Sequence, residues 1–131
     1  MSTSPATITG VDFVSIGTRD FEAAKAFYGE TLGLRCSAQY GRTPGVEFET
    51  GNLTLQVIDS AAYGMEFQAR THPVALQVAD VAAARADLEA RGVSFLGDTI
   101  DTSVCHMAVF RDPDGNVLML HHRYAPRTPQ G

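Results

Sequence analysis

The sequence predicts an α+β protein made of two tandem βαβββ modules, and three observations support this. A strand-like segment, an Asp-capped helix and a glycine stop occur twice, about sixty residues apart. Segments with alternating apolar and polar residues follow each helix, as in half-buried strands. An Asp-Pro-Asp-Gly-Asn turn joins the last two of them. The predicted fold is a curved, mixed but largely antiparallel sheet with helices outside and a concave cavity inside.

Composition favours one compact domain. The chain has 131 residues, of which 44% are hydrophobic and 19% charged, enough for a single core. No apolar run approaches the ~18 residues of a membrane span, and the N-terminus lacks the features of a secretory signal. Two cysteines, Cys36 and Cys105, are too few for a disulfide framework, which favours the cytoplasm. The net charge of −5, without any basic cluster, argues against a nucleic-acid partner.

Module one is expected over about residues 8–58, after a loose N-terminal end. Its first strand, residues 10–18, places Val14 and Ile16 on one face. Asp20 is a suitable N-cap for a helix that ends at Gly33. Three further strands are expected at residues 35–40, 46–50 and 53–58.

Module two is expected over about residues 72–124, after a connector at 59–71 and before a flexible tail at 125–131. It repeats the same order of elements. A strand at 74–78 leads to a helix capped by Asp80 and ended by Gly92. The remaining strands are expected at residues 93–96, 104–110 and 117–122. Both modules together are treated as one domain over residues 1–131.

The alternation of side chains separates a helix-facing side of each strand from a cavity-facing side. The uniformly apolar side is expected to pack on the helices, so the other side should line the cavity. Those lining residues are Phe13, Ser15, Thr54, Gln56, Ile58, Pro73, Ala75, Gln77, Val117, Met119 and His121. On the strand before the last turn, Cys105, Met107 and Val109 form the apolar set, which would place His106 and Phe110 in the cavity.

Several short motifs in this order resemble those of the glyoxalase/bleomycin-resistance/extradiol-dioxygenase superfamily, also called the vicinal oxygen chelate fold. They are Phe27-Tyr28, Leu32-Gly33-Leu34 and the turn at residues 112–116, and the likeness covers about residues 8–122. The resemblance implies two paired modules around a cavity, where enzymes of the family commonly hold a divalent metal through His, Glu or Gln. It also implies a homodimer, because members of this size often complete the pocket with a partner.

The ligand positions that the resemblance implies do not carry a suitable donor set. They fall on Phe13, Gln56, Pro73 and Met119. Phe and Pro offer no donor atom, and a thioether is poorly suited to Mg²⁺, Mn²⁺ or Zn²⁺. No cofactor is therefore expected. A displaced divalent metal site remains as an alternative, and its candidate ligands are His72, His106, His121 and Glu47.

The function predicted from these residues is metal-independent binding of a small organic ligand in the cavity. The expected ligand-binding residues are Phe13, Ser15, Glu47, Gln56, Gln77, Phe110, Met119 and His121. One alternative is a lyase, isomerase or dioxygenase that uses a displaced metal, or His106 and His121 in acid–base catalysis. Another is an interaction module without a ligand. The identity of the ligand stays open.

Overall fold

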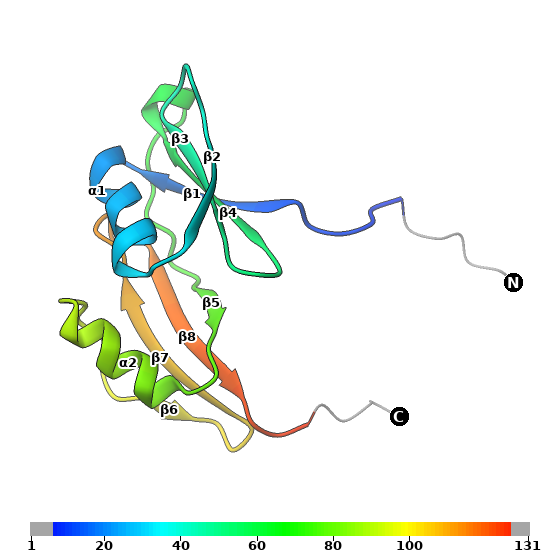
Figure 1. Ribbon diagram of the computed structural model, residues 1–131, viewed down its shortest axis with the longest axis vertical. Coiled ribbons are helices and arrows are strands. Elements are labelled where there is room, and N and C mark those ends of the chain that lie inside the picture. Colours follow the sequence, from blue (N-terminus) through cyan, green and yellow to red (C-terminus); the bar gives the residue numbers. More distant parts are fainter. Residues whose placement is uncertain (1–6, 127–131) are drawn as a thin grey trace, which may run out of the picture.

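A computed structural model describes residues 7–126 as two four-stranded sheets, with α1 and α2 on the same side of them (Figure 1). The first module contains β1 (Phe13–Thr18), α1 (Phe21–Ala26) with a π-helical continuation (Phe27–Thr31), β2 (Arg35–Gln39), β3 (Gly45–Glu49) and β4 (Thr54–Asp59). The connector holds a 3₁₀ turn (Ala61–Tyr63). The second module contains β5 (Val74–Gln77), α2 (Val81–Ala90), β6 (Ile100–Asp101), β7 (Cys105–Arg111) and β8 (Val117–Arg123). The predicted loose start and flexible tail lie largely outside the described residues.

The two sheets have the same topology. Their strand orders are β1-β4-β3-β2 and β5-β8-β7-β6. In each sheet the first pair is parallel and the other pairs are antiparallel. The predicted α+β class, the tandem βαβββ modules and the mixed, largely antiparallel pairing are confirmed. In the described part of the chain, no helix is long and apolar enough to cross a membrane.

The helix boundaries follow from local chemistry. The carboxylates of Asp20 and Asp80 accept hydrogen bonds from backbone amides of the first turn, at 3.2 and 3.0 Å. After each helix, Gly33 and Gly92 adopt positive φ values of 72° and 95°, where a side chain would be strained. Both predicted caps and both predicted glycine stops are confirmed.

The strand predicted at residues 93–96 is wrong. Phe95 forms one isolated bridge with Phe110, and Gly97 then turns the chain at a φ of 74°. The second strand of the module is instead the short β6, which pairs with β7 near its Cys105 end. A left-handed glycine ends an extended segment as it ends a helix, which accounts for the interruption.

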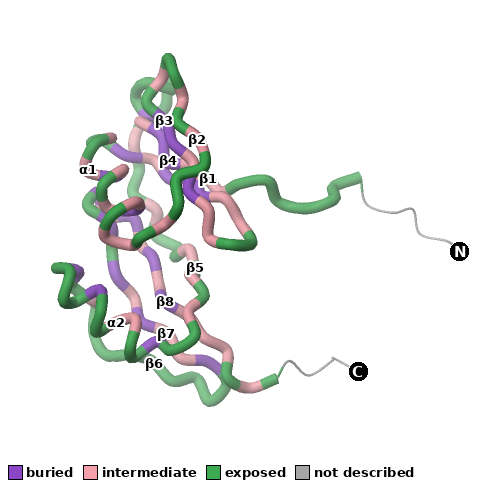
Figure 2. The backbone as a smooth tube through the Cα atoms, viewed as in Figure 1, coloured by how far each residue is buried: buried purple, intermediate pink, exposed green. Residues whose placement is uncertain are grey.

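The hydrophobic core lies between the sheets and the helices, where Figure 2 shows the buried positions of the strands. Its largest fully buried side chains include Tyr28, Phe48 and Phe110. Tyr28 lies at 6.1 Å from Phe48 between ring centroids, and Phe27 lies at 6.4 Å from Phe110. The aromatic residues of the first helix therefore join the two modules, as well as packing on their own sheet.

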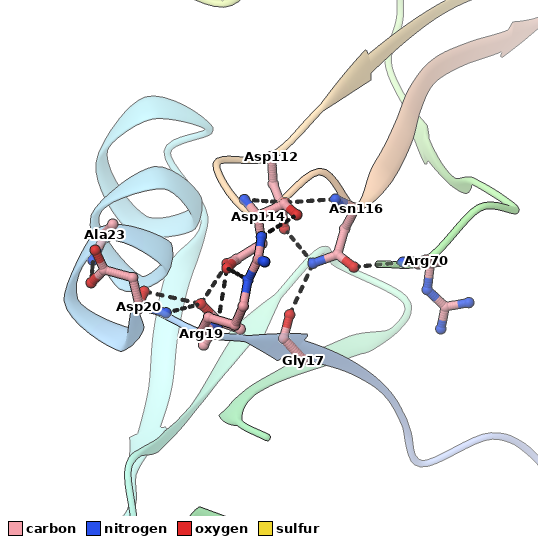
Figure 3. A network of polar contacts seen from close by, with 9 residues as sticks. Gly17, Arg19, Asp20, Ala23, Arg70, Asp112, Asp114 and Asn116 are labelled. Carbon is pink, nitrogen blue, oxygen red and sulfur yellow. Dashed lines mark hydrogen bonds and ion pairs between the residues drawn. The ribbon is translucent and has the colours of Figure 1, made fainter. Parts of the chain in front are cut away.

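A buried polar joint connects the β7–β8 turn to the first module (Figure 3). Asp112 is 5% exposed, and its carboxylate accepts from the Tyr28 hydroxyl at 2.7 Å. It also accepts from the backbone amides of Asp114 and Asn116, both at 2.9 Å, and from the Asn116 side chain. One carboxylate thus shapes the turn and fixes it to the helix.

The same turn holds the end of β1. Asp114 accepts from the Thr18 hydroxyl at 2.5 Å and from the Arg19 amide at 2.9 Å. Asn116 donates to the Gly17 carbonyl and accepts from the Arg70 amide, so it also anchors the connector. The motif that suggested the family is therefore a structural joint between the modules.

Alkaline pH should lower the stability that Tyr28 gives to the folded protein. Burial, followed by the neighbouring Asp112 carboxylate, raises the pKa of Tyr28 above its ordinary value of 10.0. Above about pH 10 the unfolded chain loses the Tyr28 proton while the folded protein keeps it, so the free energy of unfolding falls with pH. Tyr28 alone contributes a slope of about 1.4 kcal/mol per pH unit. Urea titrations between about pH 9 and 11 should show a smaller slope for Tyr28→Phe.

The control for this experiment is Tyr63→Phe, because Tyr63 lies at the surface in the connector. This variant should keep the wild-type pH slope. Equal slopes for Tyr28→Phe and the wild type would contradict the assignment of the alkaline transition to Tyr28.

Candidate functional site

The candidate site lies on the side of both sheets that α1 and α2 do not cover, here called the open face. Strand pairing brings together Ser15, Gln56 and Glu47 on this side of the first sheet. It brings together Ala75, Met119 and Val109 on this side of the second sheet, followed by Gln77, His121 and Met107. The predicted placement of Ser15, Gln56, Glu47, Gln77, Met119 and His121 on one side of their strands agrees with this pairing.

A chain of hydrogen bonds crosses the open face of the first sheet. Ser15 donates to the Gln56 carbonyl oxygen at 2.6 Å, and the Gln56 amide donates to the Tyr40 hydroxyl at 2.9 Å. Tyr40 in turn donates to the Glu47 carboxylate in a short hydrogen bond. The chain orients each polar group through its neighbour, which is the arrangement needed to present fixed donors and acceptors to a ligand.

Tyr40 is the one residue in this row of hydrogen bonds that the sequence did not predict as a site residue. Partial burial and its hydrogen bond to Glu47 raise the pKa of the Tyr40 hydroxyl, so it stays protonated. Its ring covers Gly45, and the Tyr63 hydroxyl lies beside the same glycine. A signal existed in the sequence, because Gly45 faces Tyr40 across a short loop and only glycine leaves room for the ring.

Gly45→Ala should displace the Tyr40 ring and disrupt the hydrogen bonds that link Tyr40 to Gln56 and Glu47. A Cβ at residue 45 would lie 2.7 Å from the Tyr40 Cε2 and closer still to Cδ2. We expect a loss of about 1–3 kcal/mol in the free energy of unfolding, measured with urea. Gly41→Ala is the matched control, since its Cβ would meet nothing within 4 Å. Equal losses of free energy of unfolding in Gly45→Ala and Gly41→Ala would show that the Tyr40 ring does not depend on the space left by Gly45.

The open face of the second sheet is more apolar. Met107, Val109 and Met119 lie there together, and His121 continues the row beside Gln77. Within residues 7–126, the His121 ring makes no hydrogen bond to another side chain, and it is half-buried. This face therefore offers an apolar surface to a ligand, with the His121 ring at the border of that surface.

The predicted placement of His106 and Phe110 in the cavity is wrong. In the β7–β8 pairing, Phe110 faces Leu118 and His106 faces His122, on the helix side of the sheet. Phe110 is fully buried, at 5.2 Å from Phe95 between ring centroids. The physical reason is that both faces of β7 are apolar, and the largest ring packs in the core.

His106 belongs to a separate surface cluster. Its ring lies 4.7 Å from that of Tyr124, and Nε2 lies 3.5 Å from the Asp101 carboxylate. Tyr124 donates to the same carboxylate at 2.7 Å, and this hydrogen bond lowers the pKa of Asp101. His106 and His121 thus lie on opposite sides of the sheet and cannot act together as an acid–base pair.

The positions equivalent to the family's metal ligands do not form a metal site. Gln56 is engaged by Ser15 and Tyr40, while Phe13, Pro73 and Met119 supply no suitable donor. Among residues 7–126, no group of three or more His, Cys, Asp or Glu side chains is placed to hold an ion. The residues present therefore do not fit the divalent metal that the fold suggests.

A groove lies between the modules, apart from the hydrogen-bonded chain. It has a volume of about 1310 Å³ and runs between the β3–β4 turn, α2 and the edge strand β5. Two predicted site residues, Gln77 and His121, line it, whereas Phe13, Ser15, Gln56 and Glu47 do not. Gln77 and His121 thus border both the open face of the second sheet and this groove.

The arrangement is that of α+β proteins with paired βαβββ modules and helices on one side of open sheets. The sequence model of the Glyoxalase/Bleomycin resistance protein/Dioxygenase superfamily matches residues 10–120. The chain belongs to this superfamily, as its motifs predicted. A comparison with curated protein sequences found no significant match.

Solved structures of similar fold agree with this assignment. One is TnmS3, an antibiotic binding protein from Streptomyces sp. CB03234, with 31% identity, a TM-score of 0.76, and coverage of 91% of this chain and 99% of that chain. Another is a glyoxalase/bleomycin resistance protein from the same strain, with 31% identity, a TM-score of 0.70, and coverage of 86% and 100%. A putative glyoxalase family protein from Bacillus anthracis, at 22% identity, a TM-score of 0.77 and coverage of 92% and 99%, shares the fold.

Proposed function

We propose that the protein binds a small organic ligand on its open face and does so without a bound metal. The observation that carries this proposal is the hydrogen-bonded chain of Ser15, Gln56, Tyr40 and Glu47. Aromatic surface lies near it, since Phe13 is 46% exposed and Tyr63 is 37% exposed. Fixed polar groups beside aromatic rings suit a planar ligand with its own donors and acceptors. The description of TnmS3 as an antibiotic binding protein supports the same class of function.

A second copy of the chain would complete the site. In Figure 1 the segment before β1 extends away from the domain, and Ile8 and Val11 within it are 80% and 68% exposed. Together with Phe13 these apolar side chains would be covered in a homodimer. We propose a cytoplasmic homodimer, which sedimentation at several protein concentrations can test.

Ligand binding can be tested with defined planar probes. We would use 9-aminoacridine, which is cationic, and 1,4-naphthoquinone, which is neutral, in calorimetry and thermal-shift assays. Saturable binding of either probe should raise the unfolding temperature, because a ligand of the native state stabilises it. Gln56→Ala should weaken this binding about tenfold or more, because the ligand group that bonds to Gln56 would be left without a hydrogen-bond partner.

Gln68→Ala is the matched control, because Gln68 is exposed in the connector. It should bind the probes as the wild type does. Failure of both probes to bind at millimolar concentration would count against the proposal and favour an interaction module.

Metal analysis of protein purified without chelators is the second test. If the protein holds a stoichiometric metal and His121→Ala loses it, the proposal of metal-independent binding is wrong and the enzyme alternative is favoured.

A further inference from the structure

The first strand of the second module is less covered than its counterpart in the first module. The repeat of about sixty residues aligns Ile16 with Leu76 and Thr18 with Val78. Ile16 and Thr18 are each 1% exposed, whereas Leu76 and Val78 are half-buried. The β7–β8 turn covers Thr18, which donates to Asp114 there. The corresponding β3–β4 turn and β5 instead line the groove of about 1310 Å³ between them, so β5 lacks the equivalent cover.

The edge of β5, and not one of its faces, forms a wall of this groove. All four residues of the strand, Val74–Gln77, line the groove, so it is bordered from both sides of the strand. β5 is an outermost strand of its sheet and pairs with β8 on one side. The Val78 amide donates to the His121 carbonyl of β8. Because the backbone groups of successive residues point to alternate sides, those of Ala75 and Gln77 point to the free edge.

A second uncovered element is the segment before β1, residues 7–12, here called the arm. It lies outside both sheets, and all of its residues are exposed, Ile8 by 80% and Val11 by 68%. The segment before β5 differs, because the Arg70 amide there donates to Asn116 of its own module. In Figure 1 the arm instead runs away from the domain. Its apolar side chains therefore lack a covering surface within the described part of the chain.

We propose that the arm of a second copy of the chain adds to the free edge of β5 and fills the groove. The inference rests on the homodimer proposed above and states where the partner binds. In an added strand, Ile8 and Val11 are three residues apart, so their side chains point to opposite sides of the sheet. One would pack in the groove against Leu53 and Leu76, and the other would reach the open face beside Met119. The outward backbone groups of β5 would gain partners at the same time.

The geometry favours a second copy over the arm of the same chain. The arm continues outward from β1, so it would have to turn back to reach its own groove (Figure 1). Six extended residues span about 20 Å, which exceeds the length of about 13 Å that the four residues of β5 occupy. A two-fold dimer would form the contact twice, once through each arm.

NMR on mixed copies tests which β5 an arm reaches. One preparation carries a nitroxide at Ile8→Cys and no ¹⁵N, in the background of Cys36→Ser, which removes the exposed cysteine. The other preparation carries ¹⁵N and no nitroxide. In the mixture the nitroxide should broaden the amide signals of residues 74–78, because only the partner's arm can bring it there. The control is a nitroxide at Asp98→Cys, which is exposed near β6 at the opposite edge of the same sheet and should leave these signals unchanged.

Substitutions in the arm test its contribution to the dimer. Ile8→Ser combined with Val11→Ser should raise the dissociation constant of the dimer at least about a hundredfold in sedimentation, because each arm loses two apolar side chains that would be buried. Thr7→Ser combined with Thr9→Ser is the matched control in the same segment and should leave the dissociation constant unchanged.

The outcomes separate this inference from the proposals on which it rests. A dimer in which no signal of residues 74–78 broadens leaves the homodimer intact and overturns the docking of the arm on β5. Broadening that requires the nitroxide and ¹⁵N on the same copy also overturns it, since the arm then fills the groove of its own chain. A dissociation constant unchanged by the two serines in place of Ile8 and Val11 does the same. A protein that is monomeric at every concentration overturns the homodimer as well, whereas the planar probes test ligand binding independently.

Discussion

Asp112→Ala should cost about 3–4 kcal/mol of the free energy of unfolding, a large part of what a domain of this size has. The substitution removes a buried carboxylate that accepts four hydrogen bonds, one of them from the Tyr28 hydroxyl at 2.7 Å. The remaining donors would be left buried without an acceptor, which is more costly than losing the bonds alone. Urea denaturation at neutral pH measures the change.

Asp98→Ala is the control for this prediction. Asp98 is exposed, so its removal should change the free energy of unfolding by no more than about 0.5 kcal/mol. A loss below about 1 kcal/mol in Asp112→Ala would mean that water replaces the carboxylate in the joint. The polar network would then contribute little to holding the modules together.

Phe110→Ala should cost about 3–5 kcal/mol, because it leaves a cavity in the core. Phe110 is fully buried, and its ring lies near those of Phe27, in the continuation of the first helix, and Phe95, in the loop after α2. Its neighbour Val109 lies on the opposite side of β7 and is half-buried. Val109→Ala should cost about 1 kcal/mol or less. Denaturant titrations of the two variants compare the faces of one strand directly.

The reverse order of these two costs would contradict the assignment of the core face of β7. It would restore the alternative in which Phe110 faces a ligand. A probe that binds the open face should accordingly bind Phe110→Leu, which keeps most of the core volume, as it binds the wild type.

Local signals in the sequence predicted most of the fold. Asp20 and Asp80 cap helices with their own side chains, and Gly33 and Gly92 end them through their own φ angles. Such features depend on a few neighbouring residues, so a single sequence carries them. The family motifs added the pairing of modules, which no local pattern contains.

The wrong predictions concern residues whose position is decided by tertiary packing. The alternation on β7 is ambiguous because both sides are apolar, and only its register with β8 shows that Phe110 packs inside. Tyr40 was missed because its position depends on the missing side chain of Gly45. The groove arises between elements of different modules, so no segment of the sequence displays it.

The buried polar joint also bears on the order in which this protein can fold. Thr18 and Asp114 are 96 residues apart, and Tyr28 and Asp112 are 84 apart. During synthesis the first module leaves the ribosome long before the turn that satisfies its buried hydroxyls exists. We expect the first module to stay unstable until then, and long-range closure of this kind to slow folding. The two halves repeat each other in sequence order, yet the first depends on the last strands of the second for its native state.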